Sequence, residues 1–273
     1  MPSTQVFPDD FAWGVATSAF QIEGAHDIDG RQPSIWDTYA EQPGFIEDGS
    51  NAHVACDHYH RYAEDIALMT SLGVGAYRFS VAWPRILPTG RGAVNVAGLD
   101  FYDRLVDGLL AAGIAPWATL YHWDLPQALE DEGGWTSRST VDAFVELADT
   151  VSGRLGDRVE HWITHNEPWC ASVLGYAQGV HAPGKKSWTD ALIASHHMLL
   201  SHGRAVPVIR CHAPQSKVGI TMLVAECEPA SPSEADRISA RQFDGELTRW
   251  FLDPIYLGRY PKDVVAYHER EGR

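Results

Sequence analysis

The sequence has 273 residues, of which 45% are hydrophobic and 21% charged, a composition typical of a folded globular protein and not of a disordered or collagen-like one. Its 21 Lys and Arg against 36 Asp and Glu give a formal net charge of −15, which argues against nucleic acid or an anionic membrane as the main partner. The N-terminus has no basic segment followed by an apolar one, and no run of about 18 apolar residues occurs that would span a bilayer. We therefore expect a cytoplasmic protein. The four cysteines form no CxxC pair, which favours reduced thiols over a redox motif or a zinc site.

Short apolar runs alternate with longer amphipathic segments along the chain. The pattern predicts strands at residues 11–19, 76–83, 115–123, 159–168 and 218–225. It predicts helices at 53–73, 96–113, 137–156, 188–213 and about 233–252, and a further short helix in the tail, 259–273. This alternation is typical of a parallel sheet built from βα units. No GxGxxG or GxxxxGK[ST] element follows a strand, which favours a β/α barrel over a nucleotide-binding sheet. We expect one domain over residues 1–273.

Polar residues lie at or just after the carboxyl ends of several of these predicted strands. In parallel β/α folds the ligand site lies at the carboxyl ends of the strands. In this sequence those positions hold Gln21, Glu23, His122, Trp123, Asp124, Asn166, Glu167 and, slightly further on, Trp169. Amide and imidazole groups hydrogen-bond sugar hydroxyls and an indole covers a C–H face, so the set fits a sugar pocket.

Glu167 is the candidate catalytic residue in this set. It would donate a proton to a glycosidic oxygen if burial and a second, ionised carboxylate keep it protonated. The structural alternative is a glutamate that caps a helix or forms an ion pair. Histidines two apart or adjacent in the chain cannot chelate together from one helix face, and neither HExxH nor GxSxG occurs. We therefore expect no metal, no cofactor and no serine hydrolase chemistry.

Several segments resemble a known family. They are FAWGVATSAFQIEGA, DHYHRYAEDIALM, AYRFSVAWPRILPTG, GLDFYDRLVDGLLAAGI, TLYHWDLPQAL, WITHNEPWC, GVHAPG and RWFLDPIYLGRYPKD. Together they are similar to family 1 glycoside hydrolases, and most of all to bacterial β-glucosidases, from about Phe7 to the last residues. The resemblance implies a (β/α)8 TIM barrel. It also implies hydrolysis, with retention, of terminal β-D-glucosyl residues from β-glucosides and cello-oligosaccharides, as in cellulose degradation.

The same resemblance implies roles for single residues. Glu167 matches the glutamate of the NEP motif and would be the general acid and base. Gln21, His122 and Asn166 match positions that bind sugar hydroxyls in the innermost subsite. Trp123 would line that subsite, and Trp169 the aglycone side.

Two residues depart from the pattern of the family. His165 stands where many relatives have an apolar residue, and it could tune the adjacent acid. Leu223 stands where the family usually has Asn, so an amide beside the pocket is missing.

The family nucleophile is the glutamate of a TENG motif at the end of the seventh strand, and this sequence contains neither TENG nor the later SLxDNxEW pattern. Glu226 and Glu228, near the fifth predicted strand, do not match the nucleophile position. At about 55 residues for each βα unit, eight units need roughly 440 residues, so the sequence corresponds to about three-fifths of a barrel. We therefore expect the acid and base half of the site without the nucleophile, and no β-glucosidase activity from the isolated chain.

Five strands of a barrel leave the edges of the first and fifth strands unpaired. We expect such a chain to self-associate or to pair with a complementing C-terminal fragment, and its substrate to be a β-glucoside of the cellobiose type. One alternative is a non-catalytic sugar-binding or scaffold protein, in which Gln21, His122 and Asn166 hold glucose without cleaving it. Another is an ordinary enzyme whose sequence continues past Arg273.

Overall fold

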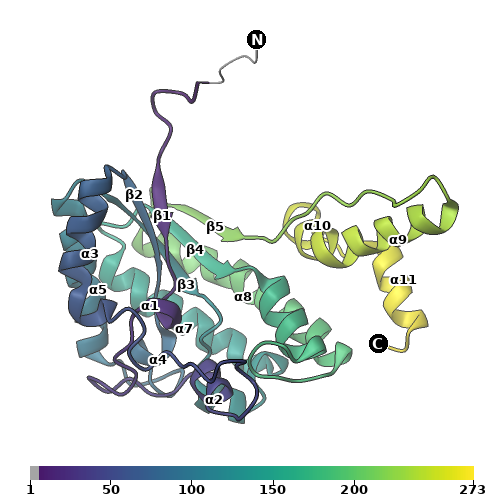
Figure 1. The fold of residues 1–273 in the computed structure, drawn as a ribbon, viewed down its shortest axis with the longest axis horizontal. Coiled ribbons are helices and arrows are strands. Elements are labelled where there is room, and N and C mark those ends of the chain that lie inside the picture. The colour runs from purple at the N-terminus through teal and green to yellow at the C-terminus, as the bar shows by residue number, and fades with distance from the viewer. Residues whose placement is uncertain (1–5) are drawn as a thin grey trace.

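A computed structural model describes residues 6–273 (Figure 1). Its centre is a parallel sheet of five strands in the order β1-β2-β3-β4-β5. The strands are β1 (Gly14–Ala16), β2 (Ala76–Ser80), β3 (Ala115–Tyr121), β4 (His161–Asn166) and β5 (Lys217–Thr221). Each strand pairs with the next one in the sequence, as successive βα units require. The predicted parallel sheet is confirmed, and all its strands end at the same edge.

Long helices follow the strands and pack around the sheet (Figure 1). They are α3 (His58–Leu72), α5 (Val96–Ala111), α7 (Arg138–Leu155) and α8 (Trp188–His212), and all four match predicted helices. A C-terminal group comprises α9 (Glu234–Asp244), the π-helical turn η3 (Gly245–Arg249), α10 (Trp250–Leu257) and α11 (Lys262–Arg270). This group lies on the side of β5 and α8, away from α3 and α5 (Figure 1). The single helix predicted at 233–252 is therefore two helices joined by η3.

The main hydrophobic core lies between the sheet and the helices. Leu109 of α5, Phe144 of α7 and Trp162 of β4 are all at most 1% exposed. Local signals explain where the helices stop and start. Gly73 ends α3 with a φ of 71°, a left-handed conformation that glycine adopts without steric cost. The Ser187 hydroxyl accepts the Asp190 N–H at 3.2 Å and so caps the first turn of α8.

Short helices at the strand ends are absent from the sequence prediction, because three to nine residues give no clear hydrophobic period. They are α1 (Ala19–Ile22), α2 (Ile35–Ala40), α4 (Trp83–Ile86), α6 (Gln127–Asp131), η1 (Gly134–Thr136) and the π-helical η2 (Cys170–Gln178). Helix α2 has a capping box, in which Ser34 and Asp37 each accept the other's backbone N–H. These segments shape the end of the sheet where the site lies.

The prediction of a buried strand over residues 11–19 is wrong in extent and in burial. Strand β1 covers only Gly14–Ala16, its three residues are exposed, and α1 begins at Ala19. Within residues 6–273, β1 pairs on one side only, so the small apolar residues that suggested burial lie at a sheet edge. Strand β5 is the opposite edge, and it ends at Thr221, four residues earlier than predicted.

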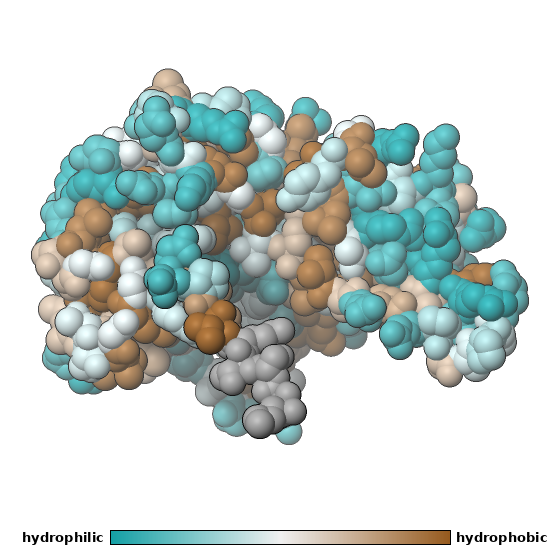
Figure 2. Space-filling model, turned by 90° about the horizontal axis from the view of Figure 1, so that it is seen from above, coloured by the Kyte–Doolittle hydropathy of each residue, from teal (hydrophilic) through white to brown (hydrophobic). Residues whose placement is uncertain are grey.

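The face of the sheet away from the long helices is hollowed. A cavity of about 630 Å³ is lined there by residues such as Trp117, His161 and Lys217. The rings of Trp117 and His161 stack with centroids 4.1 Å apart. Seen from above, hydrophobic side chains gather around the hollow between the sheet with its long helices and the C-terminal group (Figure 2). Among the described residues, no helix has the length and apolar character needed to cross a bilayer.

Candidate active site

Glu167 directly follows β4, and its backbone is fixed on both sides. Its N–H donates to the Thr221 carbonyl of β5 at 2.9 Å, and its carbonyl accepts the Ala171 N–H at 3.3 Å. Its φ of 45° lies in the left-handed region, which is uncommon for a residue with a side chain and is enriched at functional sites. The side chain is half-buried at the carboxyl end of the sheet.

A chain of hydrogen bonds orients the Glu167 carboxyl. Arg78 on β2 donates to Thr119 Oγ1 of β3 at 3.0 Å and to Asn166 Oδ1 at 2.6 Å. Because Arg78 occupies the carbonyl end of the amide, Asn166 Nδ2 points at Glu167 Oε2, 3.0 Å away. Burial lowers the pKa of Arg78, and the charge of Glu167 opposes that shift. Arg78 was not among the predicted site residues, although a charged residue inside the apolar run AYRFSVAW was a usable signal.

Three of the predicted sugar-binding residues line one cavity of about 230 Å³. They are Gln21, His122 and Trp123. Ser18 Oγ donates to Gln21 Oε1 at 2.6 Å, so the amide nitrogen of Gln21 is free to donate to a ligand. Burial, with a smaller effect from Arg78, lowers the pKa of His122 to about 3. His122 is therefore a neutral imidazole near pH 7, which is able to donate and to accept.

Asn166 and Glu167 do not line this cavity, but Trp123 connects them to it. The indole Nε1 of Trp123 donates to the Asn166 carbonyl at 2.8 Å. Trp123 has a φ of 78°, so two left-handed residues, Trp123 and Glu167, lie at the ends of adjacent strands. The structure thus places five of the predicted residues at one edge of the sheet: Gln21, His122, Trp123, Asn166 and Glu167.

Four further residues of the cavity wall were not predicted as site residues. Trp36 of α2 and His181, in the loop after η2, line the cavity beside Phe20 and Ser18. The ring centroid of His181 lies 5.2 Å from that of Trp36 and 5.4 Å from that of Trp123. Burial lowers the pKa of His181. The GVHAPG segment containing His181 follows a helix instead of a strand, so the rule that found the other residues did not apply to it.

Trp169 lies elsewhere. It packs, half-buried, against a second hydrophobic cluster formed by α8 and the C-terminal group, which includes Leu199 and Trp250. It does not line the 230 Å³ cavity. Its expected position on the aglycone side therefore stays a prediction.

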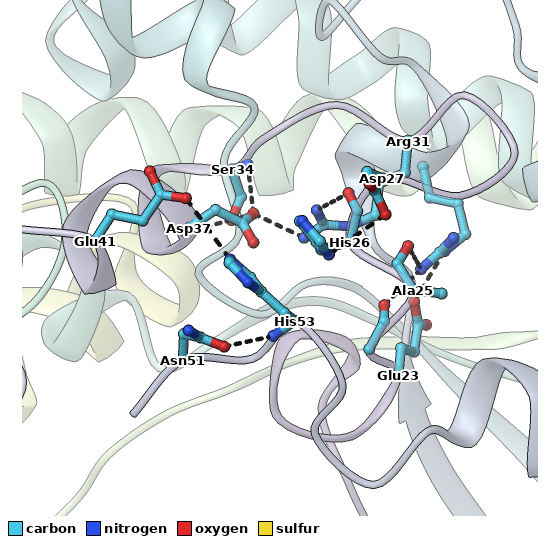
Figure 3. A network of polar contacts seen from close by, with 12 residues as sticks. Glu23, Ala25, His26, Asp27, Arg31, Ser34, Asp37, Glu41, Asn51 and His53 are labelled. Atoms are coloured by element: carbon cyan, nitrogen blue, oxygen red, sulfur yellow. Dashed lines mark hydrogen bonds and ion pairs between the residues drawn. The ribbon is translucent and has the colours of Figure 1, made fainter. Parts of the chain in front are cut away.

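A buried polar network joins the segments that form this part of the site, and Figure 3 shows Glu23, Arg31 and Asp37 of this network. Arg85 donates to Glu23 Oε2 at 3.0 Å, and the Tyr102 hydroxyl donates to Glu23 Oε1 at 2.5 Å. Arg31 pairs with Asp37 of α2 at 2.8 Å. The loop after β1, helix α2 and α4 are thereby joined to one another, which fixes the cavity wall contributed by residues 18–36.

The same network joins the loop after β3. The Ile35 N–H donates to the Leu125 carbonyl at 2.8 Å, and the Gln127 N–H donates to the Pro33 carbonyl at 2.9 Å. Asp124 lies in this loop, next to Trp123, and is 1% exposed. Neither of its carboxyl oxygens has a hydrogen-bond partner among residues 6–273. Burial, and then the charge of Glu23, raise the pKa of Asp124 to about 7, while Arg31 opposes the shift.

The structure also places the two residues that depart from the family pattern. His165 is fully buried on the helix side of β4, where Nε2 lies 2.8 Å from Ser201 Oγ and the ring stacks on Phe144 at 4.4 Å. It makes no hydrogen bond to Glu167, so a direct effect of His165 on the acid has no support in the contacts. Leu223 is half-buried beyond β5. Glu226 and Glu228 are both exposed.

Within residues 6–273, no group of three or more His, Cys, Asp and Glu side chains is arranged to hold a metal ion. The chemistry available at this edge of the sheet is that of one oriented carboxyl group, Glu167, beside a cavity of amide, imidazole and indole groups. Such groups bind hydroxyls and sugar faces, and the carboxyl group transfers protons.

Comparison with known proteins gives relatives of one kind. The chain is 49% identical over 267 residues to Beta-glucosidase A of Acetivibrio thermocellus, which covers 97% of this chain and 59% of the relative. It is 51% identical over 259 residues to a Beta-glucosidase of Agrobacterium sp., covering 95% of this chain and 56% of that protein. The chain thus spans a little under three-fifths of the length of these curated relatives.

Solved structures of similar proteins have the same fold, and the chain again spans about three-fifths of their length. The virulence factor SghA of Agrobacterium tumefaciens, in complex with its substrate analog salicin, superposes with a TM-score of 0.95 at 49% identity, covering 97% of this chain and 58% of SghA. The family 1 β-glucosidase of Thermotoga maritima superposes with a TM-score of 0.94 at 47% identity, covering 97% and 60%. The fold is that of the TIM-barrel glycosidases, with five of the barrel's eight strands in the described residues. Residues 3–273 match the sequence model of glycosyl hydrolase family 1, and the chain belongs to that family.

Proposed function

We propose that the protein is a β-glucosidase that hydrolyses terminal β-D-glucosyl residues from β-glucosides and cello-oligosaccharides with retention. One observation carries the proposal: the hydrogen-bond chain from Arg78 through Asn166 to Glu167, which ends beside the cavity of Gln21, His122 and Trp123. The names of the relatives support it, because the similar proteins from Acetivibrio and Agrobacterium are β-glucosidases.

In the proposed reaction, Gln21, His122 and Asn166 bind hydroxyls of the glucosyl unit, and Trp123 covers its face. Glu167 gives a proton to the glycosidic oxygen as the bond to the anomeric carbon breaks, and the aglycone leaves as an alcohol. Glu167 then takes a proton from the water that releases glucose. Trp169 is proposed to contact the aglycone, which requires a ligand longer than the 230 Å³ cavity holds.

Retention requires a second carboxylate about 5 Å from the first, which forms the glycosyl-enzyme. By family resemblance it is the TENG glutamate, which these 273 residues do not contain. We therefore propose that the 273-residue polypeptide is inactive alone and that a complementing C-terminal segment supplies the nucleophile. Contact through the open edges of β1 and β5, with that segment or with a second copy, is part of the same proposal, as is a single domain over residues 1–273.

The test is an assay with an aryl β-glucoside on the pure 273-residue chain, alone and mixed with a C-terminal segment of the Agrobacterium relative. We expect no turnover alone and turnover in the mixture. Ordinary enzyme rates from the chain alone would refute the need for a second segment. No turnover from a mixture that forms a stable complex would count against the β-glucosidase function.

A second candidate function, non-catalytic sugar binding, has one observation in its favour. The cavity of Gln21, His122 and Trp123 is formed without any contribution from Glu167. Calorimetry with glucose and cellobiose separates the two functions. Binding that persists in a completed but inactive barrel favours sugar binding alone, whereas binding accompanied by release of glucose favours the enzyme. The cytoplasmic location expected from the sequence stays a prediction.

A further inference from the structure

Cys170 lies against the carboxyl group of Glu167 and has no role in the function proposed so far. It is the first residue of the π-helical segment η2, three residues after Glu167, and it is 7% exposed. Its Sγ lies 3.8 Å from Glu167 Oε2, within range of a sulfur hydrogen bond. The other three cysteines lie away from the site, and two of them, Cys56 and Cys211, are exposed.

The two oxygens of Glu167 have different surroundings. Oε2 accepts from Asn166 Nδ2 at 3.0 Å and from the Cys170 thiol at 3.8 Å. Arg78 donates to Asn166 Oδ1 at 2.6 Å. The Asn166 amide therefore cannot flip, because its NH2 group would then face the N–H groups of the Arg78 guanidinium. Oε1 accepts no hydrogen bond from the described residues, and it is accessible from the surface. It therefore remains open to a ligand.

The thiol remains a donor over the whole working pH range. Burial, and then the charge of Glu167, raise the pKa of Cys170 to about 12. A thiolate at this position would repel the carboxylate, whereas the S–H group hydrogen-bonds it. Within residues 6–273, Arg78 from β2 is the charged group whose pKa responds to Glu167, and the neutral His122 lies beside Arg78.

We propose that Cys170 is a positioning residue for proton transfer: with Asn166 it occupies Oε2 of Glu167 and leaves Oε1 as the oxygen that carries the transferable proton. A proton on Oε2 would lie beside two donors, N–H and S–H, and would make that oxygen a weaker acceptor for both of them. In the acid step, Oε1–H therefore gives its proton to the glycosidic oxygen, which also keeps the electron pair of the broken bond. The negative charge that remains on the carboxylate is stabilised at Oε2 by the same two donors.

The proposal rests on the function assigned to Glu167, but its test needs no turnover. The probe is the NMR titration of the 273-residue chain carrying ¹³C-labelled Glu and Cys. In the unmodified chain, the Cys170 Cβ signal should shift with the same midpoint as the Glu167 carboxyl signal, since the thiol responds to the charge it faces. A Cys170 signal that does not follow Glu167 would overturn the proposal without any variant.

The variants test the donor itself. In Cys170→Ala, loss of a donor to the charged form should move the Glu167 midpoint up by about 0.3 to 0.5 pH units, a two- to threefold change in its protonation equilibrium. Cys170→Ser keeps a donor on the same carbon and should recover at least half of that shift. Cys211→Ala, at an exposed position on α8, is the matched control and should leave the midpoint unchanged. An unmoved midpoint in Cys170→Ala, or equal shifts in the Ala and Ser variants, would refute the role of the thiol. A failed glucosidase assay would leave these outcomes unaffected.

Discussion

Asp124 offers the sharpest prediction about stability, because it is a carboxyl group with 1% exposure, and neither oxygen has a hydrogen-bond partner in the described part of the chain. Burial raises its pKa from 3.8 to about 7. A carboxyl whose pKa is higher in the folded than in the unfolded protein stabilises the fold below the unfolded pKa, and this contribution is lost as the pH rises through the folded value. The protein should therefore be less stable at pH 8 than at pH 5.

The size of this effect follows from the shift. A difference of about three pH units corresponds to about 4 kcal/mol over the whole titration at 1.36 kcal/mol for each unit. About 1.5 kcal/mol of this is already lost at pH 5, because that pH lies about one unit above the unfolded pKa, so we expect about 2 to 3 kcal/mol between pH 5 and pH 8. In Asp124→Asn the group no longer titrates. Any constant cost of placing an amide there cancels when the two pH values are compared.

The assay is urea unfolding, followed by tryptophan fluorescence at pH 5 and pH 8. The free energy of unfolding should fall by about 2 to 3 kcal/mol more between these pH values in the unmodified protein than in Asp124→Asn. Asp10→Asn, at an exposed position, is the matched control and should show the full decrease. Equal pH dependence in the unmodified protein and in Asp124→Asn would refute the assignment of a buried, proton-binding Asp124.

Three further predictions test the support of the site. Arg85→Met leaves the Glu23 carboxylate buried without its ion pair and should lower the free energy of unfolding by about 3 to 5 kcal/mol; a loss below about 1 kcal/mol would mean that the pair is not buried. Gly24→Ala should cost at least about 1 to 3 kcal/mol in the same measurement, because Gly24 has a φ of +63° and a Cβ there would lie 2.1 Å from the Val54 carbonyl oxygen. Gln21→Ala should weaken glucose binding about tenfold in calorimetry, the effect of one lost hydrogen bond to a sugar hydroxyl, whereas Gln32→Ala at an exposed position should not change it.

Much of the fold follows from the sequence because its long helices have a clear period. Helices α5, α7 and α8 lie within one or two residues of the predicted bounds. The short pieces α1, α2 and α4 were missed, since they depend on contacts with other segments, such as the hydrogen bond from Ile35 N–H to the Leu125 carbonyl. The burial expected for 11–19 was wrong because small apolar residues suit an edge strand as well as a central one.

The candidate site was predictable in part, for a similar reason. The rule that strand ends carry the chemistry identified Gln21, His122, Trp123, Asn166 and Glu167, which the structure places together. It did not identify Arg78, which acts from inside a strand, or Trp36 and His181, which reach the cavity from loops and a short helix. Contacts between residues about 90 positions apart, such as Arg78 and Asn166, have no local signature in a single sequence.

The most direct test of the account is whether Glu167 is the acid and base of a retaining glucosidase. The measurement is the product formed from 2,4-dinitrophenyl β-glucoside and azide by Glu167→Ala, in a barrel completed with the C-terminal segment of the Agrobacterium relative. The activated leaving group needs no acid, so the glycosyl-enzyme should form and azide, which needs no base, should intercept it. The account predicts β-glucosyl azide from the variant, with turnover of unactivated glucosides lost. Unchanged turnover of unactivated glucosides by Glu167→Ala would contradict it.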